Sequence, residues 1–439
     1  MGAVDEVVGF ASDLIRIDTT NTGDEATTVG ERAAAEYVAG KLAEVGYDAT
    51  YLESGARGRG NVVARLAGGD PGRGALLVHA HLDVVPADAA DWSVHPLSGE
   101  VADGYLWGRG AIDMKHMVAM SLAVARQLKR EGHVPPRDLI FAFVADEESG
   151  GFRGARWLAE HRPDLFEGAT EAIGEVGGFS VTLREGVRAY LVQTAEKAAL
   201  WLRLRTRGQG GHGSLPHADS ALATLADAVT RLHRHSFPVV WTDPVRELVT
   251  ALGRLTGHPI PADDPEPAIA ALGEAPGLGG LSRLLAAALR DTAAVTIFNA
   301  GLKANVIPGS ATAEADCRVL PGREEAFVRE LAAVLGPGIE WEYDSLPAIE
   351  TTFDGSLVER MRAAIGAEDP GAPLLPYLLP AATDAKSFQS LGIRHFGFAP
   401  VRLPAELDFP ALFHGVDERV PIDGLRFGTR VLERLLRDC

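Results

Sequence analysis

The sequence predicts an α/β protein with a three-layer catalytic domain, in which helices cover a central mixed sheet, and with an inserted α+β domain. Residues 74–82 and 137–145 are almost continuously apolar, as strands buried on both faces are. Amphipathic helical stretches separate them, which is typical of a sheet covered by helices. Residues 200–205 instead alternate between apolar and polar, as expected of a strand with one exposed face.

The first part of the chain is predicted from apolar spacing to alternate between helices and strands. Apolar residues at helical spacing indicate helices, and short apolar runs indicate strands. The predicted helices are residues 6–15, 28–45 and 114–130, and the predicted strands are residues 61–66, 74–82 and 137–145.

The middle of the chain reads as two strand–helix–strand halves, with helices at 220–233 and 324–335 and strands at 200–205, within 304–319 and at 339–343. Residues 237–291, rich in Pro, Gly and Ala, are predicted to form a helical insertion between the halves. The pattern of the first part of the chain then resumes with a predicted helix at 357–365. We therefore predict a catalytic domain formed by residues 1–195 and 348–439, with a lid or dimerisation domain at 196–347 inserted into it.

Composition narrows the class of protein. A chain of 439 residues is long enough for two domains. The net charge of −18 argues against nucleic acid and against anionic membranes as partners. No apolar stretch reaches membrane-spanning length, and the N-terminal residues lack a signal-peptide pattern. Only two cysteines occur, Cys317 and Cys439, so we expect no disulfide framework and a cytoplasmic location.

Acidic residues and histidines stand at the ends of the apolar runs. Adjacent carboxylates at the mouth of a buried strand repel one another and lose hydration, and a bound cation relieves both effects. Each feature has a structural alternative by itself, such as a helix N-cap for Asp113. Together they favour a metal site with two ions. The residues concerned are His81, Asp83, Asp113, Glu147, Glu148, Glu175 and His414.

The order of these motifs resembles that of the M20 family of metallopeptidases. The motifs are His81-Leu82-Asp83, Gly108-Arg109-Gly110 with Asp113-Met114-Lys115, Asp146-Glu147-Glu148, Glu175-Val176-Gly177-Gly178 and His414-Gly415-Val416-Asp417-Glu418. The similarity runs from residues 15–21 to His414. The family includes aminoacylases, carboxypeptidases, desuccinylases and dipeptidases. The run Phe396-Gly397-Phe398-Ala399-Pro400 resembles most the branch of carboxypeptidase-S-like enzymes and N-acyl-amino-acid hydrolases.

The resemblance implies two divalent metal ions per chain, with zinc expected and cobalt or manganese as alternatives. Asp113 would bridge both ions. His81 and Glu175 would complete one site, and Glu148 and His414 the other. Such imidazole and carboxylate ligands suit catalytic zinc.

Three further roles follow from the same resemblance. Asp83 would orient His81, and Glu147 would be the general base that moves a proton from water to the leaving nitrogen. His212, in a Gly-His-Gly lid motif, would stabilise the oxyanion, and in dimeric relatives it comes from the partner subunit. Arg318 and Asn305 would hold the substrate, because a guanidinium fork matches a carboxylate.

The expected function is that of a zinc-dependent amidohydrolase acting on an N-acyl amino acid or small peptide with a free carboxylate. A dipeptidase or carboxypeptidase is the nearest alternative, followed by a carbamoyl-amide hydrolase and a non-catalytic metal-binding homologue. The substrate is thus a small molecule or short peptide. The lid motif favours a homodimer, whereas the helical insertion at 237–291 offers a cover for the site within one chain.

Overall fold

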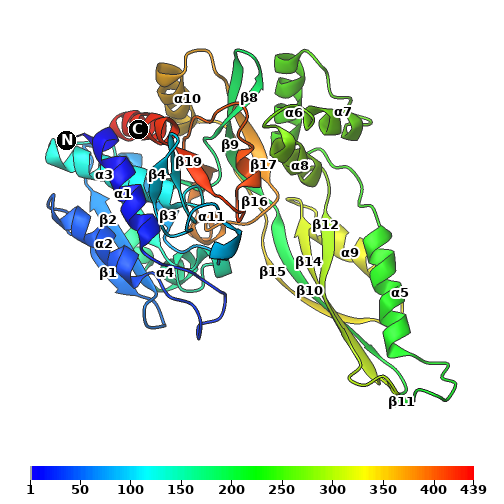
Figure 1. Cartoon of the computed structure of the whole chain (residues 1–439). Helices are drawn as coiled ribbons and strands as arrows, with labels where there is room; N and C mark the ends of the chain where they lie inside the picture. Colours follow the sequence, from blue (N-terminus) through cyan, green and yellow to red (C-terminus); the bar gives the residue numbers. More distant parts are fainter. Residues whose placement is uncertain (1) are drawn as a thin grey trace.

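The computed structural model describes residues 2–439 and has two bodies, each built on its own sheet (Figure 1). The larger body holds a ten-stranded sheet, and the smaller body holds a four-stranded sheet that extends away from it. Helices flank the large sheet on both faces. The predicted fold class is therefore confirmed: a mixed central sheet lies between two helical layers.

The large sheet is mixed. Its central strands β6, β3, β7 and β18 are parallel to one another, whereas β1, β2 and β16 pair antiparallel with their neighbours. In spatial order the strands are β1 Thr50–Glu53, β2 Gly60–Leu66, β6 Leu139–Val144, β3 Ala75–His81, β7 Ala169–Gly174, β18 Arg394–Gly397, β9 Val187–Glu196 and β16 Ile349–Glu350, with β8 Ser180–Arg184 and β17 Leu374–Leu379 also paired to β9.

Successive residues of the central strands feed two separate cores, because side chains alternate between the faces of a sheet. Leu76 and Val78 join the larger core, while Leu77 joins a smaller core on the other face. The helices over the larger core are α1 Ala3–Arg16, α2 Arg32–Ala43, α3 Lys115–Arg130, α10 Ser356–Glu368 and α12 Ile422–Asp438, and those over the smaller core are α4 Ala155–His161 and α11 Ala385–Gln389.

Helix α2 begins later than the predicted start of residue 28. Gly30 has a φ of +88°, a left-handed conformation that a helix cannot contain. Thr28 instead lies in a turn, where its backbone N–H donates to the carbonyl of Asp24. The helical spacing thus continues through a segment whose backbone is not helical.

The small sheet is antiparallel and is covered on one face only. Leu200, Leu202 and Leu204 point into its core, and Trp201 on the other face is 38% exposed, which confirms the predicted alternation. Helices α5 Ala221–Arg234 and α9 Glu324–Leu335 cover the buried face. In spatial order the strands are β12 Thr292–Ala300, β14 Ser310–Val319, β10 Ala198–Arg207 and β15 Glu340–Leu346.

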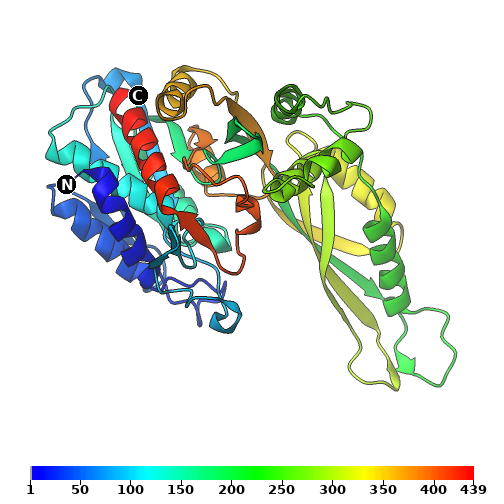
Figure 2. The same cartoon turned by 45° about the horizontal axis from the view of Figure 1, so that its top comes forward.

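The helical insertion lies against the large body, although its ends connect to the small one (Figures 1 and 2). It forms α6 Asp243–Thr256, α7 Glu266–Leu272 and α8 Gly279–Ala288. Leu248, Leu252 and Leu285 join the larger core of the ten-stranded sheet. Segment 243–288 is thus continuous in packing with the large body, and the predicted domain limits of 195 and 347 stay a prediction.

A buried lysine holds the two points at which the chain crosses between the bodies. The Lys386 ammonium donates to the carbonyls of Lys197 and Pro347, both at 2.8 Å. It also lies 3.3 Å from the carboxylate of Glu196, the last residue of β9. One side chain of the large body therefore fixes both crossing segments.

Two small sheets complete the fold. One consists of β4 Glu100–Ala102, β5 Tyr105–Trp107 and β19 Arg419–Pro421, and the other of β11 Gly211–His212 and β13 Val306–Ile307. Among residues 2–439, no helix combines the length and the apolar character that crossing a membrane requires.

Candidate metal centre and active site

The candidate ligands meet at one edge of the large sheet. Strands β6, β3 and β7 are parallel neighbours, so their carboxyl ends share that edge. His81 is the last residue of β3, Glu148 lies just beyond β6, and Glu175 directly follows β7. Asp113 comes from the loop that leads into α3, and His414 from the loop before β19. The fold thus brings residues that are distant in the chain to one edge of the sheet.

Two groups of ligand atoms form around Asp113. In each group all the atoms lie within 4.8 Å of one another. His81 Nε2 lies 3.1 Å from Asp113 Oδ1 and 3.5 Å from Glu175 Oε2. His414 Nε2 lies 3.2 Å from both Asp113 Oδ2 and Glu148 Oε2. The two oxygens of Asp113 therefore face different groups, as a ligand shared by two ions must.

Unpartnered oxygens support a cation at each group. Glu148 Oε1 and Glu175 Oε1 are buried without a hydrogen-bond donor among residues 2–439. A buried carboxylate oxygen without a donor is costly unless a cation contacts it. Burial and the charge of Asp113 also raise the pKa of Glu148 to about 7. This donor set of imidazoles and carboxylates fits a pair of divalent ions.

Asp83 connects the first ligand strand to the turn after β6. The side chain is fully buried and accepts hydrogen bonds from the backbone N–H groups of Glu147 and Glu148, both at 3.1 Å. Its Oδ1 lies 3.5 Å from His81 Nδ1. Burial acts to raise the pKa of Asp83, but hydrogen bonds from His81 and Asn21 hold it below its ordinary value. Asp83 is thus a charged residue that orients both segments.

Glu147 stands beside the ligand groups without belonging to either. Burial and the neighbouring charge of Glu175 raise its pKa well above the ordinary value. A divalent cation nearby would oppose that shift, because it favours the charged carboxylate. Glu147 is therefore a carboxylate beside the ligand groups that holds a proton more readily than an ordinary glutamate.

Asp146, which the sequence left without a role, holds the turn that presents Glu147. Asp146 Oδ1 accepts from Arg59 Nη2 at 2.6 Å, and Oδ2 accepts from the backbone N–H of Arg153 at 2.9 Å. Its φ of +67° makes the sharp change of direction after β6. Arg59 is itself paired with buried Glu31 at 2.9 Å.

Glu418 is a second functional candidate that the sequence did not single out. It is fully buried and accepts from the backbone N–H groups of Ile112 at 2.7 Å and Asp113 at 3.1 Å. Arg109 Nη1 donates to it at 2.7 Å, and Arg109 Nη2 donates to the carbonyl of His414 at 3.3 Å. The available signal was its position in the His414 motif. The Glu418–Arg109 pair therefore positions Asp113, the ligand shared by both groups, and His414, which comes from a distant segment of the chain.

Two further histidines near the ligands have no ligand geometry. His79 Nε2 forms a 2.7 Å hydrogen bond with His395 Nε2 inside the sheet, which makes it a packing residue. His116 lies in the first turn of α3, is 4% exposed, and has a pKa that burial lowers to about 4. Its Nδ1 has no hydrogen-bond partner within residues 2–439.

Two of the three candidates from the small body, His212 and Asn305, lie apart from the ligand groups (Figures 1 and 2). His212 on β11 and Asn305 lie together, since the Gly213 N–H donates to the Asn305 carbonyl at 2.9 Å. This tip is the end of the small body farthest from the large sheet (Figures 1 and 2). Arg318 lies at the other end of β14, paired with Asp316 at 2.7 Å. One chain therefore does not bring His212 or Asn305 to the ligand groups.

This fold and this ligand cluster define a metal-dependent hydrolase of amide or peptide bonds. A profile of Peptidase family M20/M25/M40 matches residues 77–438, and the chain belongs to that family.

Relatives and solved structures agree with this assignment. The chain is 28% identical to N-fatty-acyl-amino acid synthase/hydrolase PM20D1 of Xenopus tropicalis, with 99% of this chain and 86% of that protein covered. It is 31% identical to Probable carboxypeptidase S-like 2 of Dictyostelium discoideum, with coverage of 79% and 68%. Its fold is similar to that of the M20 metallo-carboxypeptidase Sso-CP2 from Sulfolobus solfataricus, with a TM-score of 0.74, 17% identity and 99% of both chains covered.

Proposed function

We propose that the protein is a dinuclear zinc amidohydrolase that removes the acyl group from N-acyl amino acids. The observation that carries the proposal is the shared position of Asp113, whose two oxygens each face a histidine and a glutamate. The proposed ligands are His81, Asp113, Glu148, Glu175 and His414. Cobalt or manganese is the alternative metal.

In this proposal, the ions held by these residues would polarise the substrate carbonyl and lower the pKa of water. Glu147 takes the proton from the attacking water and delivers it to the leaving nitrogen. Asp83 keeps His81 in one orientation and holds the turn that carries Glu147. The raised pKa of Glu147 supports this role, because a carboxylate that holds a proton more readily than an ordinary glutamate can carry it from the water to the leaving nitrogen.

The proposed substrate combines an apolar acyl group with a free carboxylate. The relatives named for N-fatty-acyl-amino acids and for carboxypeptidase S support this class. Arg318 would bind the carboxylate by exchanging it for Asp316, its present partner at 2.7 Å, with Asn305 as a second contact. A dipeptidase or carboxypeptidase is the alternative, and it differs only in what the pocket recognises.

We further propose a cytoplasmic homodimer. The distance of His212 from the ligand groups within one chain supports its delivery by a partner subunit. There it would donate a hydrogen bond to the oxyanion. The absence of a membrane-crossing helix among residues 2–439 agrees with this proposal, as do the two buried, unpaired cysteines.

The experiment that tests the function is a hydrolysis panel with wild-type protein and Glu147→Gln. The panel contains N-acetyl and longer N-acyl amino acids, dipeptides and N-carbamoyl amino acids, each with zinc added. We expect cleavage of N-acyl amino acids by the wild type. Glu147→Gln should retain its zinc and lose about 100-fold or more in kcat. Cleavage confined to dipeptides with a free amine would favour the alternative, and full activity in Glu147→Gln would remove it as the base.

A further inference from the structure

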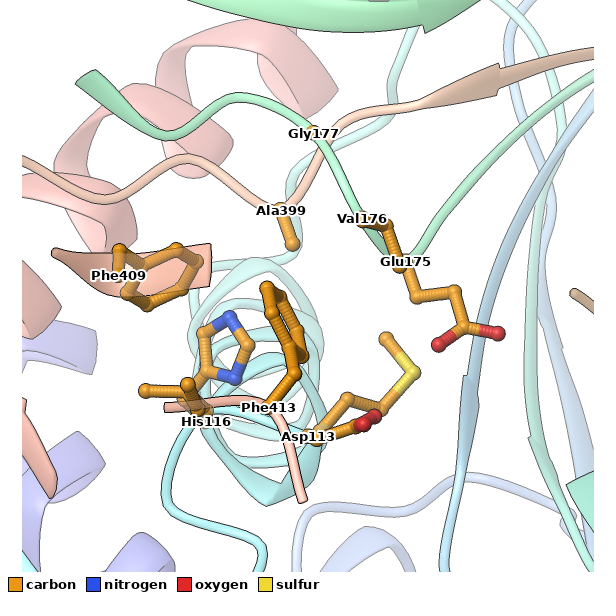
Figure 3. A pocket seen from close by; sticks show the side chains of 10 residues that line it. Asp113, His116, Glu175, Val176, Gly177, Ala399, Phe409 and Phe413 are labelled. Atoms are coloured by element: carbon orange, nitrogen blue, oxygen red, sulfur yellow. The ribbon is translucent and has the colours of Figure 1, made fainter. Parts of the chain in front are cut away.

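The candidate site is assembled from loops, so its geometry depends on the groups that hold those loops in place. Asp113 and Glu175 reach the site from separate segments, and both carboxylates lie to the right of the His116 ring in Figure 3. Glu147 and Glu148 lie on a third segment, a turn just after β6. A side chain that fixes this turn therefore also fixes the proposed base and one proposed ligand.

One buried side chain, the amide of Asn21, bonds to both ends of the segment that carries the two glutamates. Asn21 is 3% exposed. Its Nδ2 donates to Asp146 Oδ1 at 3.1 Å, and its Oδ1 accepts from Ser149 Oγ at 3.0 Å. Since Asp146 and Ser149 flank Glu147 and Glu148 in the chain, the Asn21 amide spans the segment that carries them.

The same amide connects this turn to the strand that ends in His81. Asn21 Nδ2 donates a second hydrogen bond, to Asp83 Oδ2 at 2.9 Å. Asp83 in turn accepts from the backbone N–H groups of Glu147 and Glu148. Asp83 also lies 3.5 Å from His81. Asn21 therefore reaches the two glutamates by two routes, through the ends of their segment and through Asp83.

The NH₂ group of Asn21 lies between two buried carboxylates. Asp83 is 0% exposed and Asp146 is 4% exposed. Arg59 pairs with Asp146 at 2.6 Å, and its other carboxylate partner is Glu31 rather than Asp83. Buried like charges repel one another, and a donor that bonds to both relieves the repulsion. An aspartate of the same shape at position 21 would instead add another carboxylate and remove the donor.

The backbone beside Asn21 is held against the segment that follows β3. The Asn21 N–H donates to the carbonyl of Val84 at 2.9 Å, and Thr19 Oγ1 donates to the carbonyl of Leu82 at 2.7 Å. The Val84 N–H donates back to the carbonyl of Thr19 at 3.2 Å. Because Leu82 and Val84 flank Asp83, these bonds fix Asn21 relative to Asp83.

We infer that Asn21 is a positioning residue that holds the turn of residues 146–151 against Asp83, and so sets the position of Glu147 relative to His81. The inference rests on the proposed function for the roles of Glu147 and His81, and it goes beyond that function by assigning a role to a residue outside the ligand motifs. A displacement of about 1 Å can cost a catalytic group about 100-fold in rate. Asn21 thus affects the reaction without contacting the substrate.

Hydrogen exchange tests whether Asn21 holds the turn, and it requires neither metal nor substrate. The measurement uses the full chain in chelator and a peptide that covers residues 145–152. Asn21→Ala should speed exchange in this peptide about tenfold, because the turn opens more readily. Tyr47→Phe is the matched control. It removes a buried hydrogen bond of 3.0 Å to the carbonyl of Ala125, outside this network, and should leave exchange in the peptide within about twofold.

Two further variants keep the test decisive if Asn21→Ala does not fold. Ser149→Ala removes one contact from a half-buried side chain and should speed exchange in the same peptide about threefold. Asn21→Asp keeps the shape of the side chain and removes the donor, so it should speed exchange at least as much as Asn21→Ala. Exchange at the wild-type rate in Asn21→Asp would show that only the volume of the side chain matters.

Kinetics at saturating zinc connect the turn to the reaction. With N-acetyl-leucine and N-octanoyl-leucine, Asn21→Ala should lower kcat about 10- to 100-fold and leave KM within about twofold. If the wild type hydrolyses no compound of the panel, the proposed function fails, and exchange still decides whether Asn21 holds the turn. Wild-type exchange in the Asn21 variants and in Ser149→Ala, or an unchanged kcat of Asn21→Ala beside an active wild type, would overturn the inference.

Discussion

Glu418 and Arg109 form a fully buried ion pair of 2.7 Å that also binds the backbone of both ligand loops. The carboxylate accepts the N–H of Asp113, and the guanidinium donates to the carbonyl of His414. Asp113 and His414 are far apart in the chain and face each other at 3.2 Å. The pair therefore sets the spacing of two proposed ligands without touching the reacting atoms.

We predict that Glu418→Gln destabilises the protein by about 3 kcal/mol, because it leaves Arg109 as a buried charge without its partner. Zinc affinity should fall about 10- to 100-fold, as it does when groups that orient ligands are lost. Thermal unfolding and zinc titration measure the two effects. Asp417→Asn is the control: that neighbouring carboxylate binds Ser93 near the surface and should change stability by about 1 kcal/mol or less. Equal zinc affinity in wild type and Glu418→Gln would contradict the positioning role.

Asp83→Asn should weaken zinc binding about 10- to 100-fold and lower kcat, because the neutral amide no longer fixes the orientation of His81. It also disturbs the N–H contacts of Glu147 and Glu148 at 3.1 Å. Zinc titration and steady-state kinetics measure the outcome. Asp18→Asn serves as the control, since that exposed carboxylate accepts hydrogen bonds from Thr20 and contacts neither His81 nor the turn that carries Glu147. Unchanged zinc affinity in Asp83→Asn would show that Asp83 only supports the fold.

In the chelated protein, the contribution of Glu148 to stability should be lost as the pH rises from about 5 to about 8. The pKa of Glu148 is about 7 in the fold against an ordinary 4.5, so the folded state binds more protons in this interval. Stability present at low pH is then lost as pH rises through 7, by on the order of 1–3 kcal/mol. His414, whose pKa is raised to about 10 by the hydrogen bonds that it donates to Asp113 and Glu148, adds to this loss above pH 6.5, because the unfolded chain releases the proton that the folded state keeps.

Thermal unfolding in chelator at several pH values measures this slope. Glu148→Gln should flatten it in part, because Glu147 also has a raised pKa. Zinc should reverse the trend, since it binds the deprotonated ligands and gains affinity with pH. Identical pH slopes in the chelated wild type and the chelated Glu148→Gln variant would refute the electrostatic account of the cluster.

The activity lost in His212→Ala should be restored only by a partner subunit that carries an intact His212. His212→Ala should lower kcat about 100-fold while zinc content and stability remain normal, because the residue lies at the exposed tip of the small body. If the proposed dimer exists, mixing His212→Ala with Glu147→Gln should restore up to about a quarter of wild-type activity, through sites that combine both intact residues. Mixtures as inactive as the separate variants, from subunits shown to exchange, would exclude delivery by a partner.

The sequence predicted the buried strands at the centre of the large sheet. Residues 74–82 and 137–145 became β3 and β6, because runs that are apolar on both faces fit only a covered sheet. The motif resemblance implied that His81, Asp113 and Glu175 lie together, and their ligand atoms form one group.

Other features depend on packing that a sequence pattern does not record. The amphipathic pattern of α6 and α8 predicts one buried face but not which sheet it covers, and both pack on the large body. Strand β9 was not predicted, because Gln193, Thr194 and Glu196 interrupt its apolar run. The roles of Asp146 and Glu418 require their partners Arg59 and Arg109, which tertiary folding brings into contact.

The central claim is that Asp113 is shared by two metal ions, and a zinc-edge anomalous diffraction measurement on zinc-loaded crystals tests it most directly. We predict two anomalous peaks about 3.5–4 Å apart, one beside each oxygen of Asp113. One should contact His81 and Glu175, and the other Glu148 and His414. A single peak, or peaks that do not contact Asp113, would contradict the account.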